Sequence, residues 1–168
     1  MNVPTVESYF FAPDGRTPNN ALPVVIYRQV ATAADLAKQL QAMFQRNGWT
    51  NNWQDIILDR DHYHTTTHEV LGISRGEVTL QLGGAGGQRV VVRAGDVLII
   101  PAGIGHFSRS GTADYGVIGG YPDGRAWDMV YNEPAHYKAA LETISQLPLP
   151  TSHPLLGAAI IPGWGDGG

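Results

Sequence analysis

The sequence predicts an all-β fold of the sandwich or barrel type, flanked by a few helices. The chain holds 21 glycines and 11 prolines in 168 residues, and most apolar runs between them are short, which is typical of strands joined by frequent turns. Many short strands have to hide their edges, and a double-sheet jelly roll is one arrangement that does so. A chain of this length can bury one sizeable core, so a single domain is the simplest organisation.

One stretch departs from the strand pattern and predicts a helix over residues 32–47. Thr32 can cap its start, and Gly48 follows the last periodic residue, where a glycine commonly ends a helix. Apolar residues recur at helical spacing along the stretch: Ala33, Leu36, Leu40, Met43 and Phe44. A stripe of this kind predicts packing against the rest of the domain rather than a ligand groove.

From Trp53 onward the sequence predicts strands. The expected strands are residues 55–64, 69–74, 77–82, 88–93, 97–100 and 115–121. Arg75-Gly76, between the second and third of these, predicts a tight hairpin. The glycine-rich run at 83–87 resembles a phosphate-binding loop, but strand-like residues follow it instead of a helix, so a flexible hairpin end is the better interpretation.

A second short helix is expected over residues 133–146, followed by a proline-rich tail that wraps the surface. The sequence shows no internal repeat. We therefore expect one domain over residues 1–168. Its barrel core spans about residues 53–125, preceded by an extension and a helix over 1–52 and followed by a helix and the tail over 126–168.

Composition and charge exclude several classes of function. The formal net charge is −4 and the pI is near 5.8, with the 11 basic residues scattered singly, which argues against a nucleic-acid partner. The chain has no cysteine, so disulfides, thiolate metal ligands and a thiol nucleophile are excluded. No apolar run reaches membrane-spanning length, and residues 1–9 lack the pattern of a signal peptide, so a cytoplasmic location without a membrane partner is expected.

The most informative feature is a cluster of histidines between positions 62 and 106, which holds four of the six in the chain. His62 and His64 are two residues apart, so on a strand their side chains share a face. Glu69 follows at an odd offset that one unbroken strand would send to the other face, so the intervening Thr65-Thr66-Thr67 must turn. Imidazoles and a carboxylate are ligands that a divalent transition metal accepts, and this pattern predicts a metal site.

Two motifs in this region resemble those of the cupin family. The first runs His62-x-His64, four residues, Glu69, six residues and Gly76; the second runs Gly95, five residues, Pro101-x-Gly103, two residues and His106. Eighteen residues separate the motifs, a short spacer typical of small bacterial cupins. The chain departs from the family pattern at Ile56 and Ser110, where a glycine and an asparagine are often found. Neither position supplies a metal ligand.

The resemblance implies an RmlC-like jelly-roll barrel, also described as a double-stranded β-helix, in which three histidines and one glutamate bind one divalent metal. Carried over residue by residue, the ligands are His62, His64, Glu69 and His106. Within the family the chain resembles the YjlB-like group of single-domain bacterial cupins, through Pro18-Asn19-Asn20, residues 64–72 and residues 120–124. Iron, manganese, nickel, cobalt and zinc all suit these ligands. The resemblance also implies a homodimer, because cupins commonly pair through barrel edges and N-terminal segments.

Two further residues are weak candidates for catalysis. Arg60 shares the parity of His62 on the expected strand and would point inward, toward a carboxylate of the protein or of the substrate. The alternative places Arg60 at the barrel rim, paired with Asp59, Asp61 or water. Tyr121 could offer its hydroxyl to the pocket or could pack in the core.

The other histidines are expected to lie outside the chemistry. His68 is adjacent to Glu69 and should point to the opposite face of the strand, where it would pack in the turn or contact a second subunit. A role for His68 near the metal is the alternative. His136 and His153 lie in the predicted second helix and in the tail, and neither is expected to act in catalysis.

Three imidazoles and one carboxylate leave a divalent ion with a net positive charge, which favours an anionic ligand with two oxygen donors. The sequence therefore predicts a metal-dependent enzyme of the dioxygenase, isomerase or decarboxylase type, acting on a small oxygenated metabolite. The alternative is a non-catalytic barrel that binds a small molecule as a sensor or carrier. A metal-free, epimerase-like activity is a third interpretation, which the intact ligand set disfavours.

Overall fold

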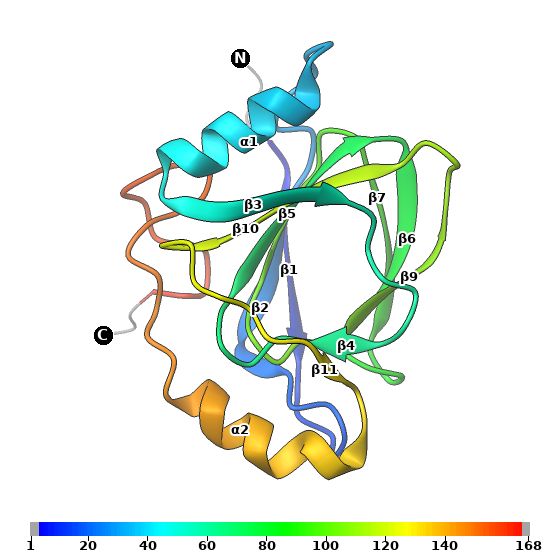
Figure 1. The fold of residues 1–168 in the computed structure, drawn as a ribbon, viewed down its shortest axis with the longest axis vertical. Coiled ribbons are helices and arrows are strands. Elements are labelled where there is room, and N and C mark those ends of the chain that lie inside the picture. Colours follow the sequence, from blue (N-terminus) through cyan, green and yellow to red (C-terminus); the bar gives the residue numbers. More distant parts are fainter. Residues whose placement is uncertain (1–3, 166–168) are drawn as a thin grey trace.

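Two antiparallel sheets face each other and enclose the core (Figure 1). The structure, a computed structural model, describes residues 4–165. One sheet has six strands in the order β1 (Val6–Phe11), β2 (Asn20–Tyr27), β8 (Val97–Ile100), β5 (Glu69–Arg75), β10 (Gly116–Pro122) and β3 (Trp49–Asp55). The other has five in the order β11 (Val130–Tyr131), β4 (His62–Tyr63), β9 (His106–Gly111), β6 (Glu77–Leu82) and β7 (Gln88–Arg93). This arrangement confirms the predicted jelly-roll barrel.

Side chains of the six-stranded sheet alternate between two apolar layers, as the period of two along a strand requires. On β2, Val24 and Ile26 point into the barrel, whereas Val25 and Tyr27 point to its outer side. The inward residues pack against the five-stranded sheet, through side chains such as Leu80. Both faces of the inner strands β2, β8, β5 and β10 are therefore mostly buried, whereas the edge strands β1 and β3 are partly exposed.

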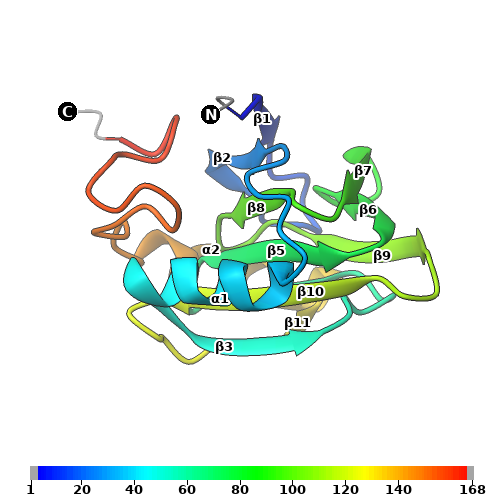
Figure 2. The same ribbon diagram turned by 90° about the horizontal axis from the view of Figure 1, so that it is seen from above.

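The outer layer is completed by α1 (Leu36–Arg46), which lies across β3, β5 and β10 (Figure 2). Leu36, Leu40 and Phe44 are its buried residues, which confirms the predicted packing role of the stripe. The predicted start at Thr32 is wrong. Thr32 and Ala33 are exposed and lie before the helix, because Leu36 is the first residue of the stripe that the sheet can bury.

The single strand expected over residues 55–64 is also wrong. β3 ends at Asp55 and belongs to the six-stranded sheet, whereas β4 begins at His62 and belongs to the five-stranded sheet. The link between them carries Asp59, Arg60 and Asp61, charged residues that a strand buried on one face would have to desolvate. The prediction that Arg60 points inward with His62 is therefore wrong, because no continuous strand connects Arg60 to His62.

The hairpin predicted at Arg75-Gly76 does not form. β5 pairs with β8 and β10, whereas β6 pairs with β7 and β9, so the chain changes sheets at this turn. Gly76 has a φ of +67°, and a Cβ there would lie 2.2 Å from the hydroxyl oxygen of Thr112, so the corner requires glycine. The predicted hairpin end at 83–87 is confirmed, since β6 and β7 pair from Leu82 and Gln88 outward.

Strands before residue 53 contribute directly to the six-stranded sheet. β1 and β2 lie at one edge of it, β3 at the other, in the segment that the sequence suggested as an extension. The second predicted helix corresponds to a short 3₁₀ turn, η1 (Pro134–His136), followed by α2 (Tyr137–Ser145). Ile161 and Trp164 of the tail pack into the outer layer. No helix in the described part of the chain is long and apolar enough to cross a membrane.

Candidate metal centre

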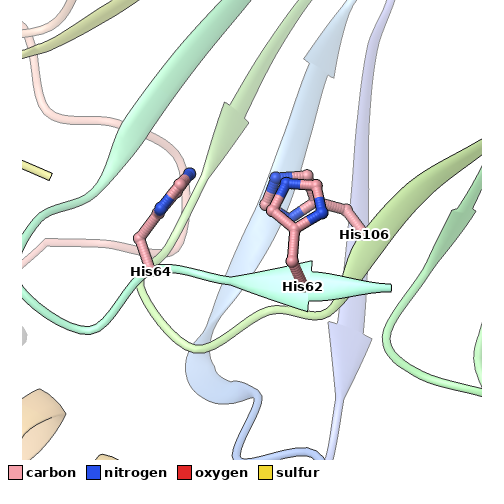
Figure 3. Close-up of side chains that lie close together, drawn as sticks. All are labelled: His62, His64 and His106. Atoms are coloured by element: carbon pink, nitrogen blue, oxygen red, sulfur yellow. The ribbon is translucent and has the colours of Figure 1, made fainter. Parts of the chain in front are cut away.

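Three buried histidines converge inside the barrel from two neighbouring strands (Figure 3). His62 on β4 pairs in register with His106 on β9, and their ring centroids are 4.3 Å apart. His64 follows β4 directly and shares the face of His62, as the spacing of two predicts. One ring nitrogen from each histidine lies within 4.8 Å of those from the other two, so the three can hold a metal ion.

The three rings are oriented by the backbone. Nδ1 of His62 donates to the carbonyl of Arg60 at 2.8 Å, and Nδ1 of His106 donates to the carbonyl of Ile104 at 2.9 Å. Nδ1 of His64 donates to the carbonyl of Asp128. A neutral imidazole that donates from Nδ1 keeps its lone pair on Nε2, and this outer hydrogen bond is typical of histidines that ligate metals. All three histidines therefore present Nε2 as a possible ligand atom.

Glu69 reaches the same space from β5, in the opposite sheet. Its Oε1 lies 3.5 Å from Nε2 of His64 and 3.5 Å from Nε2 of His106. Two ligand atoms that are each about 2.1 Å from one ion are themselves about 3.0–3.4 Å apart at angles between about 90° and 109°. Oε1 is buried and accepts no hydrogen bond from the described residues. A buried, unpartnered carboxylate oxygen at this spacing fits a cation between the side chains.

Burial and mutual charge favour neutral His62 and ionised Glu69, the forms in which these two groups bind metals. Burial, together with the neighbouring His106 and His64, lowers the pKa of His62 to about 3. Burial alone would raise the pKa of Glu69, but the adjacent His64 and His106 outweigh it and lower that pKa below its usual range. Burial opposes protonation of His64 as well, yet the Glu69 carboxylate raises the pKa of His64. Metal ligands must be neutral imidazole and ionised carboxylate, so a metal ion competes with a proton for His64.

The turn between His64 and Glu69 is held by a residue that the sequence analysis missed. Asp128 accepts hydrogen bonds from the backbone and hydroxyl of Thr65, at 2.7 and 2.5 Å, and from the backbone of Thr66 at 3.1 Å. The turn predicted at Thr65-Thr66-Thr67 is present, and it brings Glu69 back beside His64. Asp128 lies about 60 positions away and belongs to no motif, so no local signal could have identified it.

Tyr121 fulfils both roles that the sequence left open. It is fully buried on β10, and its hydroxyl donates to Oε2 of Glu69 at 2.9 Å. The same hydroxyl accepts from Nε1 of Trp53 at 2.8 Å. Burial and the nearby carboxylate raise the pKa of Tyr121, so it remains a hydrogen-bond donor to Glu69. The structure thus places Tyr121 next to the centre as a group that orients Glu69.

Arg60 lies outside the centre, at the rim. Its side chain is 58% exposed, forms an ion pair with Glu133 at 3.1 Å and covers the ring of Tyr131 at 3.5 Å. The rim location matches the predicted alternative, but the partner is neither Asp59 nor Asp61. The link from β3 to β4 turns the guanidinium outward, where it keeps its hydration.

The remaining histidines lie away from the cluster. Nδ1 of the buried His68 accepts from the backbone of Ala102 at 2.9 Å, and its ring meets Trp164 edge-on at 4.9 Å, on the outer face of the sheet. His153 is buried in the tail against Tyr27. His136 is half-exposed beside Glu133. These contacts are structural, and none of them involves a candidate metal ligand.

A cavity of about 450 Å³ opens beside the histidines and Glu69. Trp127 and Met129, from the segment after β10, form part of its wall, together with Trp53 of β3 and Leu58 of the link to β4. None of these residues belongs to a sequence motif. Their side chains converge from separate segments, so only the fold reveals them as neighbours. The cavity gives a small molecule access to the candidate ligand atoms.

Fold and site together define a cupin, and the chain belongs to the cupin family, whose domain model matches residues 58–114. The chain is 38% identical over 152 residues to the uncharacterized protein YjlB of Bacillus subtilis (strain 168), covering 90% of either chain. This similarity confirms the resemblance to the YjlB-like group.

Solved structures overlap with the chain only in part. Acireductone dioxygenase from Bacillus anthracis, with a cadmium ion in its active centre, is 18% identical with a TM-score of 0.36 over 51% of this chain and 58% of that one. The RmlC epimerase of Legionella pneumophila is 11% identical with a TM-score of 0.40, over 70% of this chain and 71% of that one.

Proposed function

We propose that the chain is a metal-dependent enzyme whose single divalent transition metal is held by His62, His64, Glu69 and His106. One observation carries the proposal. Three histidines donate from Nδ1 to backbone carbonyls and turn Nε2 toward a common space, where the unpartnered Oε1 of Glu69 also lies. Without a cation between these side chains, the buried Oε1 of Glu69 would be desolvated and would have no hydrogen-bond partner.

The donor set limits the metal. Nitrogen donors with one carboxylate suit iron, manganese, nickel, cobalt and zinc, and affinity alone does not select among them. When bound, the ion supplies a Lewis acid for polarising a substrate oxygen and, if it is iron or manganese, a route for electrons to dioxygen. The substrate is a small oxygenated, anionic metabolite, and the reaction is an oxidation, an isomerisation or a decarboxylation.

The chain's own groups orient and shield the site. The backbone carbonyls of Arg60, Asp128 and Ile104 hold the imidazole rings, and the hydroxyl of Tyr121 holds Glu69. Apolar side chains around the cavity exclude bulk water from the reacting groups, which strengthens the electrostatic interactions there.

The test compares His106→Ala with His136→Ala. Protein purified without chelators is expected to carry close to one metal per chain, measured by atomic emission. His106→Ala should lose most of that metal and all turnover on a panel of hydroxy acids, diketones and enols, whereas the half-exposed His136 should be replaceable without loss of either.

Two results would contradict the proposal. Full turnover in His106→Ala, or in protein freed of metal, would show that the metal is not required. Metal retained at one per chain with no turnover on any compound would favour the alternative, a non-catalytic binding protein.

We further propose that the chain is one domain and forms a homodimer, as the resemblance to cupins implies. Sedimentation equilibrium should give twice the chain mass of 18.1 kDa. A monomer mass at micromolar concentration would contradict this.

A further inference from the structure

The cavity beside the histidines has the candidate metal ligands at one end and a wall that is apolar except for Asn51, Asn52 and Asp55. At the polar end lie the Nε2 atoms and Glu69. Elsewhere the lining is largely apolar and aromatic: Trp53, Ile57, Leu58, Leu71, Trp127 and Met129. The volume of about 450 Å³ is in the lower half of the range typical of small-molecule sites. This space suits a small ligand with an apolar body and a polar end.

Trp127 makes part of the wall flat. Its ring stacks on Tyr121 with centroids 6.3 Å apart and planes 23° apart, and it meets His64 edge-on at 5.6 Å. The adjacent Asp128 is anchored to the turn after His64, which fixes the segment that carries the indole. Trp127 borders the cavity, and 43% of its surface is exposed and free to pack against a ligand. A planar group bound beside His64 would bury that surface.

Charge limits the ligand further. Within the described part of the chain, the residues that line this cavity include no lysine and no arginine, whereas Asp55 and Glu69 are acidic. The amide of Asn52 donates to the carbonyls of Trp49 and Gly119 and is not free to bind an anion. A phosphate or a second carboxylate on the ligand would be buried near acidic groups without a cationic partner, which is costly.

From these walls we infer that the cavity takes a planar, largely apolar ligand with two neighbouring oxygen donors and at most one negative charge, a catechol or an enolised aryl ketone in chemical class. The position of the oxygen donors rests on the proposed metal centre. The flat apolar body and the charge limit rest on the cavity wall alone. Highly charged metabolites such as sugar nucleotides and dicarboxylates are excluded by the same wall.

Three hydroxamates with one chelating group separate these requirements. Benzohydroxamate carries a flat apolar body, acetohydroxamate carries only a methyl group, and 4-carboxybenzohydroxamate adds a negative charge. Calorimetric titration of zinc-loaded protein should show benzohydroxamate binding at least about tenfold more tightly than acetohydroxamate, because only the first buries an aromatic ring on Trp127. The added carboxylate should cancel that advantage.

Variants of Trp127 test the wall directly. Trp127→Ala should weaken benzohydroxamate about tenfold and change acetohydroxamate by less than about twofold, and Trp127→Phe should restore most of the loss. Leu149→Ala, which removes an apolar side chain of similar exposure in the tail, is the matched control and should change neither. Equal affinities for the three compounds, or an equal loss for both neutral compounds in Trp127→Ala, would overturn the inference.

The same titrations on chelator-treated protein test the cavity wall independently of the metal centre. The metal content of the purified protein, measured separately, tests whether the proposed centre binds a metal. A preference for benzohydroxamate that depends on Trp127 in the metal-free protein supports the wall even if no metal is retained. Loss of that preference in both forms overturns the ligand class while leaving the metal centre intact.

Discussion

At the metal centre, the hydrogen bonds that orient the four candidate ligands determine which ligand a substitution can disturb. The Nδ1 groups of the three histidines donate to backbone carbonyls, which no side-chain substitution removes. Glu69 differs, because the orientation of its Oε2 depends on the hydroxyl of Tyr121. Tyr121 is therefore the residue through which the carboxylate can be reoriented without removing a candidate ligand.

Tyr121→Phe is expected to weaken metal binding while the barrel stays folded. The ring keeps its packing, but Oε2 of Glu69 and Nε1 of Trp53 both lose their partner. Loss of such an outer partner typically lowers metal affinity by about 10–100-fold. Competition with a chromophoric chelator measures the dissociation constant. Tyr131→Phe, at the rim under Arg60, is the control, and an unchanged affinity in Tyr121→Phe would refute a positioning role.

Asp128→Ala tests the anchor of the turn before Glu69. Burial would raise the pKa of Asp128, but hydrogen bonds from Thr65 and Thr66 outweigh it and lower that pKa, so the ionised carboxyl stabilises the folded state. Its loss should cost about 2 kcal/mol of unfolding free energy at pH 7. The contribution is present above the ordinary carboxyl pKa and is lost as pH falls through the lowered value, so the difference should shrink in acid.

Urea denaturation at pH 7 and at pH 3 measures this difference. The exposed Asp59, replaced in the same way, is the control and should change the unfolding free energy little. A cost for Asp128→Ala that is equal at both pH values would contradict the role of the ionised carboxyl.

At the scale of elements, several strands are predictable from the sequence, although β1, β2 and β9 were not expected, and the pairing of the strands is not predictable. Residues 88–93 and 97–100 were predicted as strands and coincide with β7 and β8, because apolar residues recur there between turn residues. The turn at Arg75-Gly76 has the same local pattern whether its strands pair or enter different sheets. That choice depends on contacts with β8, β9 and β10, which are distant in the sequence. For the same reason the motif residues could be nominated, whereas Asp128 and Trp127 could not.

Gly72 is the point of β5 where α1 approaches the sheet most closely. A Cβ there would lie 2.9 Å from Cζ of Phe44 and 3.0 Å from Cδ1 of Leu40, and both side chains are fully buried. Gly72→Ala should therefore push α1 outward and cost about 1–3 kcal/mol of unfolding free energy. Gly86→Ala, in the β6–β7 turn with nothing within 4 Å, is the control and should cost nothing. Equal stability of the two variants in urea would contradict the close approach.

At the scale of the whole molecule, one of the contacts that join the tail to the fold is a buried histidine. Nδ1 of His153 accepts from the backbone of Leu155 at 3.0 Å and of Leu156 at 3.2 Å, so its Nε2 carries the proton and donates to the hydroxyl of Tyr27 on β2 at 2.8 Å. A proton on Nδ1 would face two donors. This contact between the tail and β2 therefore requires the neutral ring.

His153→Gln is expected to flatten the loss of stability in mild acid. Burial lowers the pKa of His153 from 6.5 to about 4 in the folded chain. Between these values the unfolded chain binds a proton that the folded chain does not, so stability is complete above pH 6.5 and falls as the pH drops toward 4. The slope is at most about 1.4 kcal/mol per pH unit, and the loss between pH 7.5 and 4.5 is about 2.5 kcal/mol. Urea denaturation from pH 7.5 to 4.5, with a chelator in every sample, should show this slope in the wild type and in the control His136→Gln. Because other titrating groups are common to all three proteins, parallel curves for the wild type and His153→Gln would refute the prediction.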